Sequence, residues 1–317
     1  MVYTNNWSLI KEGHCKYGIM LKEDGMVMDD GVTSCINDNH FHMTTTTGGA
    51  STVMSWLEEW LQTEWPHFKV FLTSVTENWS VISISGPKAK AIINDLGCDI
   101  NLSNDSFPFM TFKDGKIDKI PVRIFRISFT GELSYEINTQ ARYGLQLWEK
   151  ILKVGQKHQL MPYGTEAMHV LRAEKGFIIV GQETDGSVNP YDLGMDWIIS
   201  NKKNDFIGKR SLERDLLSKD RKQLVGILTL DPKKVIPEGA HAIEDPNYKL
   251  PAKMLGHVTS SYYSPNCNRS IALALLKNGH SRIGETIFFP LLNKELVSAK
   301  IVKPVFFDPK GDRLNGI

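Results

Sequence analysis

A carboxylate on the apolar face of an amphipathic helix is the strongest candidate for a functional residue in this sequence. The stretch GTEAMHVLRAEKGF at 164–177 predicts a helix, and on a wheel of 100° per residue Glu174 shares one face with Ala167, Val170 and Leu171. An unpaired buried glutamate is costly, so Glu174 needs hydrogen-bond donors. A nearby arginine or a backbone amide could supply them, and so could a polar ligand with an apolar body.

The other charged residues of this helix are predicted to face solvent. Glu166, Arg172 and Lys175 point away from the apolar face on the same wheel. We therefore expect them to be solvated surface charges.

A second acidic residue interrupts an apolar strand face near the start of the chain. Residues 17–34 predict a hairpin that turns at Asp24-Gly25. Alternation along the second strand places Asp30 on the face shared by Met26, Met28 and Val32. Asp-Asp-Gly is also good turn chemistry, so Asp30 could equally cap backbone amides.

The elements around these residues predict an α+β fold. A third strand is expected through HFHMTTTT, a helix over 51–64 whose tryptophans pack in the core, strands over 68–75 and 79–85, and a helix over 87–96. Two or three strands are expected within 114–138 and a helix over 141–154.

The last third of the chain changes in pattern. Short strands with turns follow Lys209, which predicts a small antiparallel barrel or sandwich. We place the domain boundary near residue 217, which gives domains 1–217 and 218–317. No phosphate-binding glycine loop of the dinucleotide or P-loop type occurs in the sequence.

Composition excludes several classes of function. The 317 residues are 41% apolar and 23% charged with a net charge of +1, and the sequence has no basic face typical of a nucleic-acid binder. Apolar runs are too short to span a bilayer, so no membrane association is expected. Four scattered cysteines favour reduced thiols in a cytoplasmic protein, and no ligand cluster predicts a metal site.

Several motifs then resemble a known family. YGIMLKEDGMVMDDGV, LRAEKGFIIVGQETDGSVNP, DFIGKRSL, HVTSSYYSPNCNRSIALALL and KPVFF occur in the order typical of the aminomethyltransferase (glycine-cleavage T-protein) superfamily. TTTTGGA, WLEEWLQTEWP and RISFTGELSYEIN are similar to the folate-binding domain at the C-terminal end of heterotetrameric sarcosine oxidase α subunits. That domain normally has an additional N-terminal segment and an upstream dinucleotide-binding domain, so we expect this chain to be part of a longer protein.

The resemblance implies a tetrahydrofolate site. It implies that Glu174 holds the pterin and that Asp30 is catalytic, near the folate nitrogen that receives the one-carbon unit. Tyr17 corresponds to a tyrosine of the folate pocket, and Thr46 to an asparagine in T-proteins. Lys209 occupies a position where relatives carry Lys or Arg, and it could meet the glutamate tail of folate or have no specific role.

The function implied is capture of the one-carbon unit of sarcosine as 5,10-methylenetetrahydrofolate. The iminium or formaldehyde would come from an N-methyl amine oxidised on flavin-bearing partner subunits of a hetero-oligomer, with flavin and NAD held outside this chain. The alternatives are a free-standing aminomethyltransferase served by a lipoyl carrier protein, a folate-dependent demethylase of the same fold, a folate-binding accessory protein, and an inert fragment. The accessory-protein motif KGCYxGQE is not matched, because Phe177 follows Lys-Gly here.

Overall fold

In the computed structural model, which describes residues 1–214 and 220–316, the chain divides into two units. Unit 1 contains Met1–Asn6, Gly18–Asp30 and Thr165–Lys310. Unit 2 contains Trp7–Tyr17, Gly31–Gly164 and Gly311–Ile317. The domain boundary predicted near residue 217 lies outside the described residues and stays a prediction.

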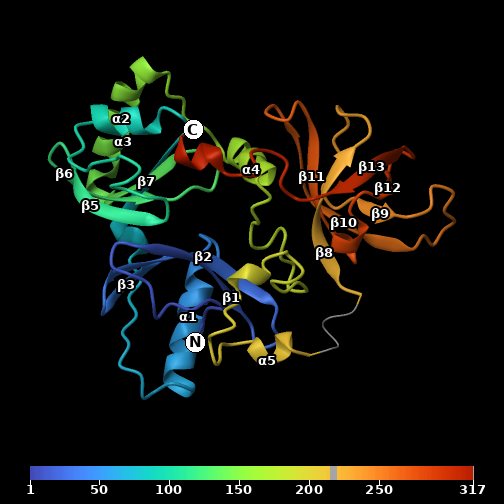
Figure 1. Cartoon of the computed structure of the whole chain (residues 1–317), viewed down its shortest axis with the longest axis horizontal. Helices are drawn as coiled ribbons and strands as arrows, with labels where there is room; N and C mark the ends of the chain where they lie inside the picture. The colour runs from blue at the N-terminus through green and yellow to red at the C-terminus, as the bar shows by residue number, and fades with distance from the viewer. Residues whose placement is uncertain (215–219, 317) are drawn as a thin grey trace. The chain divides into compact units, whose positions relative to one another are not determined.

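A closed antiparallel barrel forms the largest part of unit 1, and its strands are the orange and red arrows of Figure 1. Around the barrel the order is β10-β11-β8-β13-β12-β9. The barrel strands are β8 (Lys222–Thr229), β9 (His241–Ile243), β10 (Met254–Ser264), β11 (Arg269–Lys277), β12 (Thr286–Pro290) and β13 (Leu296–Val302). The barrel confirms the small antiparallel barrel or sandwich that was predicted to follow Lys209. Only the short β9 was not foreseen, because three residues carry too little alternation to predict a strand.

Alternating side chains fill the interior of the barrel. Buried apolar residues of neighbouring strands form one cluster, with Val225 and Ile227 on β8, Ala272 and Ala274 on β11, and Phe289 on β12. This is the period-2 alternation that a small barrel requires.

Helix α4 (Thr165–Glu174) packs on β10 and β11 of this barrel. The predicted helix over 164–177 is therefore confirmed, although it ends at Glu174. The short helix α5 (Lys209–Leu212) also belongs to unit 1.

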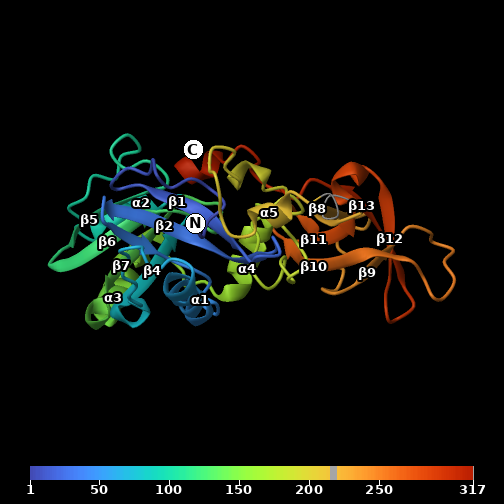
Figure 2. The same cartoon turned by 90° about the horizontal axis from the view of Figure 1, so that it is seen from below.

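Unit 2 is built on a four-stranded sheet of order β4-β7-β6-β5. Its strands are β4 (Trp79–Ser85), β5 (Thr111–Ile117), β6 (Ile120–Arg126) and β7 (Ser134–Gln140). Helices α2 (Ala89–Asp95) and α3 (Gly144–Gly155) bury Ile93, Leu147 and Ile151 against Ile124 and Ile137 of the sheet. Figure 2 shows α3 below this sheet.

A smaller sheet of order β1-β2-β3 contains β1 (Cys15–Leu21), β2 (Val27–Asn37) and β3 (His40–Met43). The predicted hairpin is confirmed, with Gly25 at φ +86° in its turn. The unit 2 portion of this sheet packs Cys15 against Phe112 and Phe125 of the larger sheet. At Gly31 a Cβ atom would lie 1.9 Å from the Thr44 carbonyl oxygen, so only glycine fits there.

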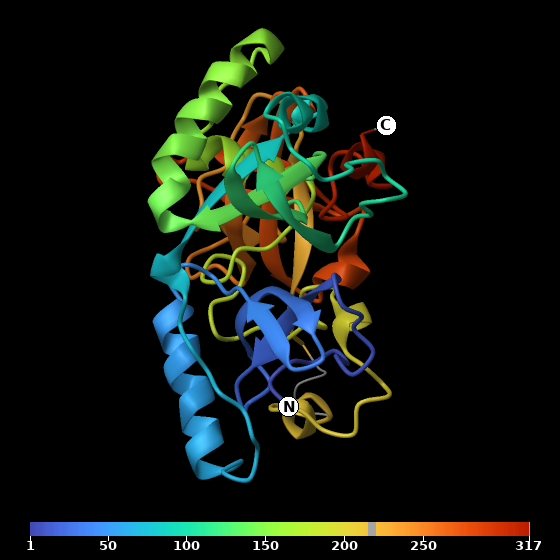
Figure 3. The ribbon, with the colours of Figure 1, turned by 90° about the vertical axis from the view of Figure 1, so that its left-hand side faces the viewer.

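Two expectations for the region around the first helix are wrong. No strand forms over 68–75, and β3 ends at Met43 instead of continuing through the threonines. Helix α1 (Ala50–Thr63) is present, but among its residues only Val53 is buried. Figure 3 shows the stretch after α1 running back beside the helix.

The tryptophans of this region pack on one another instead of in a core. Trp60 stacks on Trp65, and Trp65 stacks on Phe68. Helical spacing predicts an amphipathic helix but does not say what covers its apolar face.

Short 3-10 turns complete the described elements: η1 (Thr76–Asn78), η2 (Ala141–Tyr143), η3 (Gln156–His158), η4 (Asp196–Ile198), η5 (Gly279–Arg282) and η6 (Asp312–Asn315).

Candidate functional site

Glu174 is the last residue of α4, and its side chain is buried at 2% exposure as the sequence predicts. The Ser264 hydroxyl donates to Glu174 Oε1 at 2.6 Å, and the Asn266 amide donates to Oε2 at 2.8 Å. Both donors come from the end of β10 and the turn that follows it. Both carboxylate oxygens therefore accept hydrogen bonds from protein groups. An arginine or a backbone amide was the expected alternative to a ligand, and the donors found are neutral side chains.

The backbone at the end of α4 is also held. The Glu174 carbonyl oxygen accepts hydrogen bonds from the amides of Phe306 at 2.8 Å and Phe307 at 3.0 Å. Gly176 ends the helix at φ +67°, where a Cβ atom would lie 2.7 Å from the Pro304 carbonyl oxygen. These contacts satisfy carbonyl groups that a helix end leaves open, and they fix the position of Glu174.

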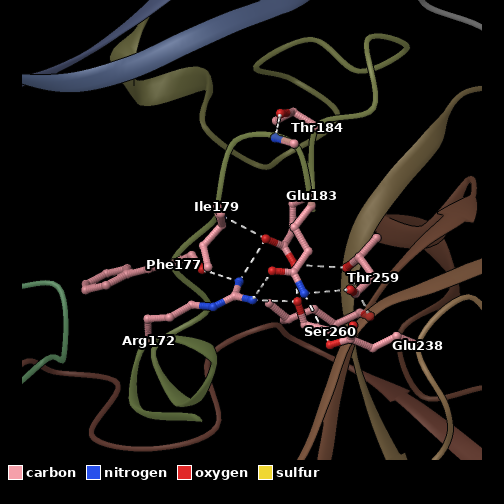
Figure 4. A network of polar contacts seen from close by, with 11 residues as sticks. Arg172, Phe177, Ile179, Glu183, Thr184, Glu238, Thr259 and Ser260 are labelled. Atoms are coloured by element: carbon pink, nitrogen blue, oxygen red, sulfur yellow. Dashed lines mark hydrogen bonds and ion pairs between the residues drawn. The ribbon is translucent and has the colours of Figure 1, made fainter. Parts of the chain in front are cut away.

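Arg172, two residues before Glu174 on α4, is the centre of a buried polar network (Figure 4). Its guanidinium forms an ion pair with Glu183 at 2.8 Å and donates to Ser260 Oγ at 2.6 Å. It also donates to the Phe177 carbonyl and to the Gln182 side chain. The arginine thus ties the loop after α4 to strand β10.

The carboxylate of Glu183 is satisfied entirely within this network. Thr259 and Ser260 donate to its Oε1 at 3.0 and 2.5 Å, and the Ile179 amide donates to its Oε2 at 2.8 Å. A buried ion pair is tolerated when further hydrogen bonds satisfy the remaining polar atoms. The Glu183 carboxylate and both terminal nitrogens of Arg172 meet that condition, whereas Arg172 Nε has no hydrogen-bond partner among the described residues.

The prediction that Arg172 and Lys175 are solvated is wrong. Arg172 has 0% and Lys175 8% of its surface exposed. Lys175 donates to the backbone carbonyl of Asp308 and pairs with its carboxylate at 3.2 Å. Their acceptors lie outside α4, in the loop after it, on β10 and near Asp308, so a helical wheel could not reveal them.

Asp30 lies in β2, in the same unit as Glu174, and is half-buried. Its backbone amide donates to Asp29 Oδ1 at 2.8 Å, and Asp29 is the more buried of the two at 3% exposure. The strand is held nearby by a hydrogen bond from the Val27 amide to the Val188 carbonyl at 2.9 Å. The catalytic role of Asp30 stays a prediction.

The remaining predicted site residues are divided between the units. Lys209 belongs to unit 1, whereas Tyr17 and Thr46 belong to unit 2, and all of them are half-buried. Lys209 Nζ donates to the carbonyls of Lys203 at 3.0 Å and Asn204 at 2.9 Å. Its charge is therefore used, at least in part, to hold its own loop.

Thr46 follows β3 in a turn and not in a strand. Its carbonyl oxygen accepts from the Gly49 amide and from the Thr45 hydroxyl, both at 3.1 Å. Tyr17 lies on β1. Their folate contacts stay predictions.

Unit 2 contains a further carboxylate with perturbed chemistry. Glu136 on β7 lies opposite Phe125 on β6 and Ser83 on β4, and burial raises the pKa of its carboxyl group to about 7. Burial also raises the pKa of the nearby Cys15 thiol to about 11. At neutral pH that thiol is protonated and a poor nucleophile.

Residues 1–214 and 220–316 contain no group of three or more His, Cys, Asp or Glu side chains arranged to hold a metal ion. Within the same residues, no helix is both long and apolar enough to cross a membrane.

Sequence reasoning missed the residues that hold Glu174 and Arg172. Ser264 and Asn266 lie in the quoted motif HVTSSYYSPNCNRS, and Ser260 lies there as well. The signal available was a run of small polar residues on an otherwise apolar barrel strand. Such side chains need hydrogen-bond partners when they are buried.

The comparisons with known proteins agree with this architecture. The family model for the GCVT N-terminal domain matches residues 1–203, and that for the glycine cleavage T-protein C-terminal barrel domain matches residues 222–308. Among solved structures, the glycine cleavage system aminomethyltransferase T from Bartonella henselae superposes with a TM-score of 0.82 at 20% identity, covering 96% of this chain and 79% of that one. This likeness concerns the fold alone.

Curated relatives fall into distinct groups. The sarcosine oxidase subunit alpha of Corynebacterium sp. (strain P-1) is 50% identical over 99% of this chain, which spans only 33% of that protein. Mitochondrial dimethylglycine dehydrogenase of Homo sapiens is 31% identical over 96% of this chain and 34% of its own length. The aminomethyltransferase of Thermoanaerobacter sp. (strain X514) is 29% identical over 95% of this chain and 78% of its own length.

Proposed function

Because the chain belongs to the glycine cleavage T-protein (GcvT) family, we propose that it binds tetrahydrofolate and captures on it the one-carbon unit released by oxidation of sarcosine. The family makes it a folate-dependent, aminomethyltransferase-like domain related to sarcosine oxidase subunit alpha and to dimethylglycine dehydrogenase. The products would be 5,10-methylenetetrahydrofolate and the amine that carried the one-carbon unit, which for sarcosine is glycine.

The observation that carries this proposal is the chemistry around Glu174. Its carboxylate is buried and accepts only from the neutral side chains of Ser264 and Asn266. A carboxylate oxygen can accept more than one hydrogen bond, so acceptor capacity remains on both oxygens. An amino group and an adjacent ring N–H, which a reduced pterin presents side by side, fit such an acceptor pair.

Asp30 is the proposed catalytic residue. Bound tetrahydrofolate would supply the nitrogen atoms that take up the one-carbon unit. A nitrogen that forms a new bond to carbon must lose a proton, and the Asp30 carboxylate would accept it. The same carboxylate would stabilise the positive charge of the incoming iminium group.

Amine oxidation is assigned to other polypeptide regions. The chain spans about a third of the length of the sarcosine oxidase α subunits that it matches. We propose that flavin and NAD are bound outside this chain and that it acts within a hetero-oligomer containing flavin-bearing subunits. A cytoplasmic location is part of the same proposal.

A free-standing aminomethyltransferase is the second candidate. The match to the Thermoanaerobacter aminomethyltransferase favours it, since this chain covers 78% of that protein. Dependence of methylene transfer on a lipoyl carrier protein would distinguish it from capture of a flavin-generated iminium.

The proposal is tested by titrating the purified chain with reduced tetrahydrofolate under anaerobic conditions and following tryptophan fluorescence or heat. Saturable one-to-one binding is expected. Binding of folic acid with equal affinity would argue against a site shaped for the reduced pterin, and lack of binding would remove the proposed function.

A further inference from the structure

The residues that contact Glu174 do more than satisfy it. Ser264 Oγ accepts a hydrogen bond from the Cys267 amide at 2.9 Å while lying 2.6 Å from Glu174 Oε1. A serine hydroxyl has a single proton. Because the backbone amide already donates to Ser264 Oγ, this proton is directed at the carboxylate.

Asn266 fixes the other oxygen. Its amide nitrogen lies 2.8 Å from Glu174 Oε2. A carboxylate can only accept, so the NH₂ group of Asn266 must face it. The two donors come from positions two residues apart at the β10–β11 turn and contact different oxygens, which fixes the rotation of the carboxylate about its last bond.

The cations nearby on the helix are engaged elsewhere. Arg172 pairs with Glu183, and Lys175 pairs with Asp308. Across residues 1–214 and 220–316, no Lys, Arg or His lies within ion-pair distance of Glu174. The carboxylate is thus oriented by the protein without being neutralised by it.

We propose that Ser264 and Asn266 are positioning residues that set the plane of the Glu174 carboxylate so that its remaining lone pairs accept two parallel N–H groups. The inference rests on the proposed function and adds a specificity rule. The site selects ligands with an amino group next to a ring N–H, as in a 2-amino-4-oxopteridine. Ligands that lack this amino group cannot form one of the two hydrogen bonds to the oriented carboxylate and should bind more weakly.

The test is a double-mutant cycle between Ser264 and the ligand amino group. Affinities of wild type and Ser264→Ala are measured for tetrahydrofolate and for its 2-desamino analogue. We expect Ser264→Ala to weaken tetrahydrofolate binding about tenfold but to weaken the analogue much less. Ser264→Thr, which keeps the hydroxyl, should restore most of the affinity.

A matched control lies on the adjacent strand. Ser270 on β11 is equally buried, and its hydroxyl has no hydrogen-bond partner among the described residues. Ser270→Ala should therefore leave both affinities unchanged. Asn266 is exposed, so Asn266→Ala keeps the fold and provides a second cycle if Ser264→Ala does not fold.

The outcomes distinguish the positioning role of Ser264 from tetrahydrofolate binding itself. If the wild-type chain binds tetrahydrofolate and Ser264→Ala weakens both ligands by the same factor, the serine is merely structural and the inference is overturned. Wild-type affinity for tetrahydrofolate in both Ser264→Ala and Asn266→Ala overturns the inference as well. If wild type binds neither ligand, the proposed function fails, and the inference falls with it.

Discussion

Two buried glutamates, Glu174 at the end of α4 and Glu183 in the loop that follows it, have opposite surroundings. Glu183 is matched by the guanidinium of Arg172 and by hydroxyl and amide donors, so its charge is balanced inside the protein. Glu174 receives only the neutral donors of Ser264 and Asn266. The first arrangement stabilises the fold, and the second is the one that we propose binds a ligand.

The strongest effect is expected where the charge is balanced. Glu183→Gln would leave Arg172 buried without a counterion, which should lower the free energy of unfolding by about 3–5 kcal/mol. Urea denaturation followed by circular dichroism measures this. Glu166→Gln, an exposed change on α4, the helix that carries Arg172, is the control and should change the unfolding free energy little. Near-equal stability of both variants would contradict a structural role for the ion pair.

The Asp30→Asn variant tests whether this carboxylate acts in the chemical step and not in folate binding. Asp30→Asn preserves shape and removes the proton acceptor, so we expect tetrahydrofolate affinity within about twofold of wild type and methylene capture slowed about 100-fold. The rate is measured as 5,10-methylenetetrahydrofolate formed with the flavin subunits and sarcosine present. Unaltered capture would remove Asp30 from the mechanism.

Glu136 extends the comparison to a carboxylate whose burial favours its protonated form. Its pKa is raised from 4.5 to about 7 by burial, so the unfolded chain releases this proton at lower pH than the folded chain. Its contribution to stability therefore falls as pH rises from about 4.5 to about 7 and is constant above that range.

Glu136→Gln should remove this pH dependence and make the protein about 2 kcal/mol more stable than wild type at pH 8. Thermal unfolding between pH 5 and pH 8 measures the effect. Glu149→Gln, an exposed change on α3, should retain the wild-type slope. A slope that survives in Glu136→Gln would show that another group titrates.

The smallest effect is expected at Lys209. Its ammonium holds the carbonyls of Lys203 and Asn204, so Lys209→Ala should cost about 1 kcal/mol of stability. Affinity for tetrahydrofolate should stay within about twofold, compared by titration with Lys202→Ala, an exposed neighbour. A large loss of affinity would instead place Lys209 at the glutamate tail.

The sequence predicted features that depend on local pattern. Alternation and turn residues were enough for the β1–β2 hairpin and most of the barrel strands, and helical spacing was enough for α1 and α4. The burial of Glu174 followed from its place among apolar neighbours. These are properties of a few consecutive residues, which a single sequence displays directly.

The features that were missed depend on contacts between distant residues. Arg172 was predicted to be a surface charge on α4, yet it pairs with Glu183, which lies 11 positions away and outside the helix, and donates to Ser260, 88 positions away. Lys175 finds Asp308 133 positions away. The tryptophans of α1 were assigned to the core because spacing shows amphipathicity, whereas burial depends on what covers the apolar face.

The measurement that most directly tests the account is the tetrahydrofolate affinity of Glu174→Gln relative to wild type, with thermal stability recorded for both. Glutamine keeps the size of the side chain but loses the charge and one acceptor. We predict affinity lower by about 30-fold or more, with a native fold. Wild-type affinity in Glu174→Gln would contradict the claim that this carboxylate holds the pterin.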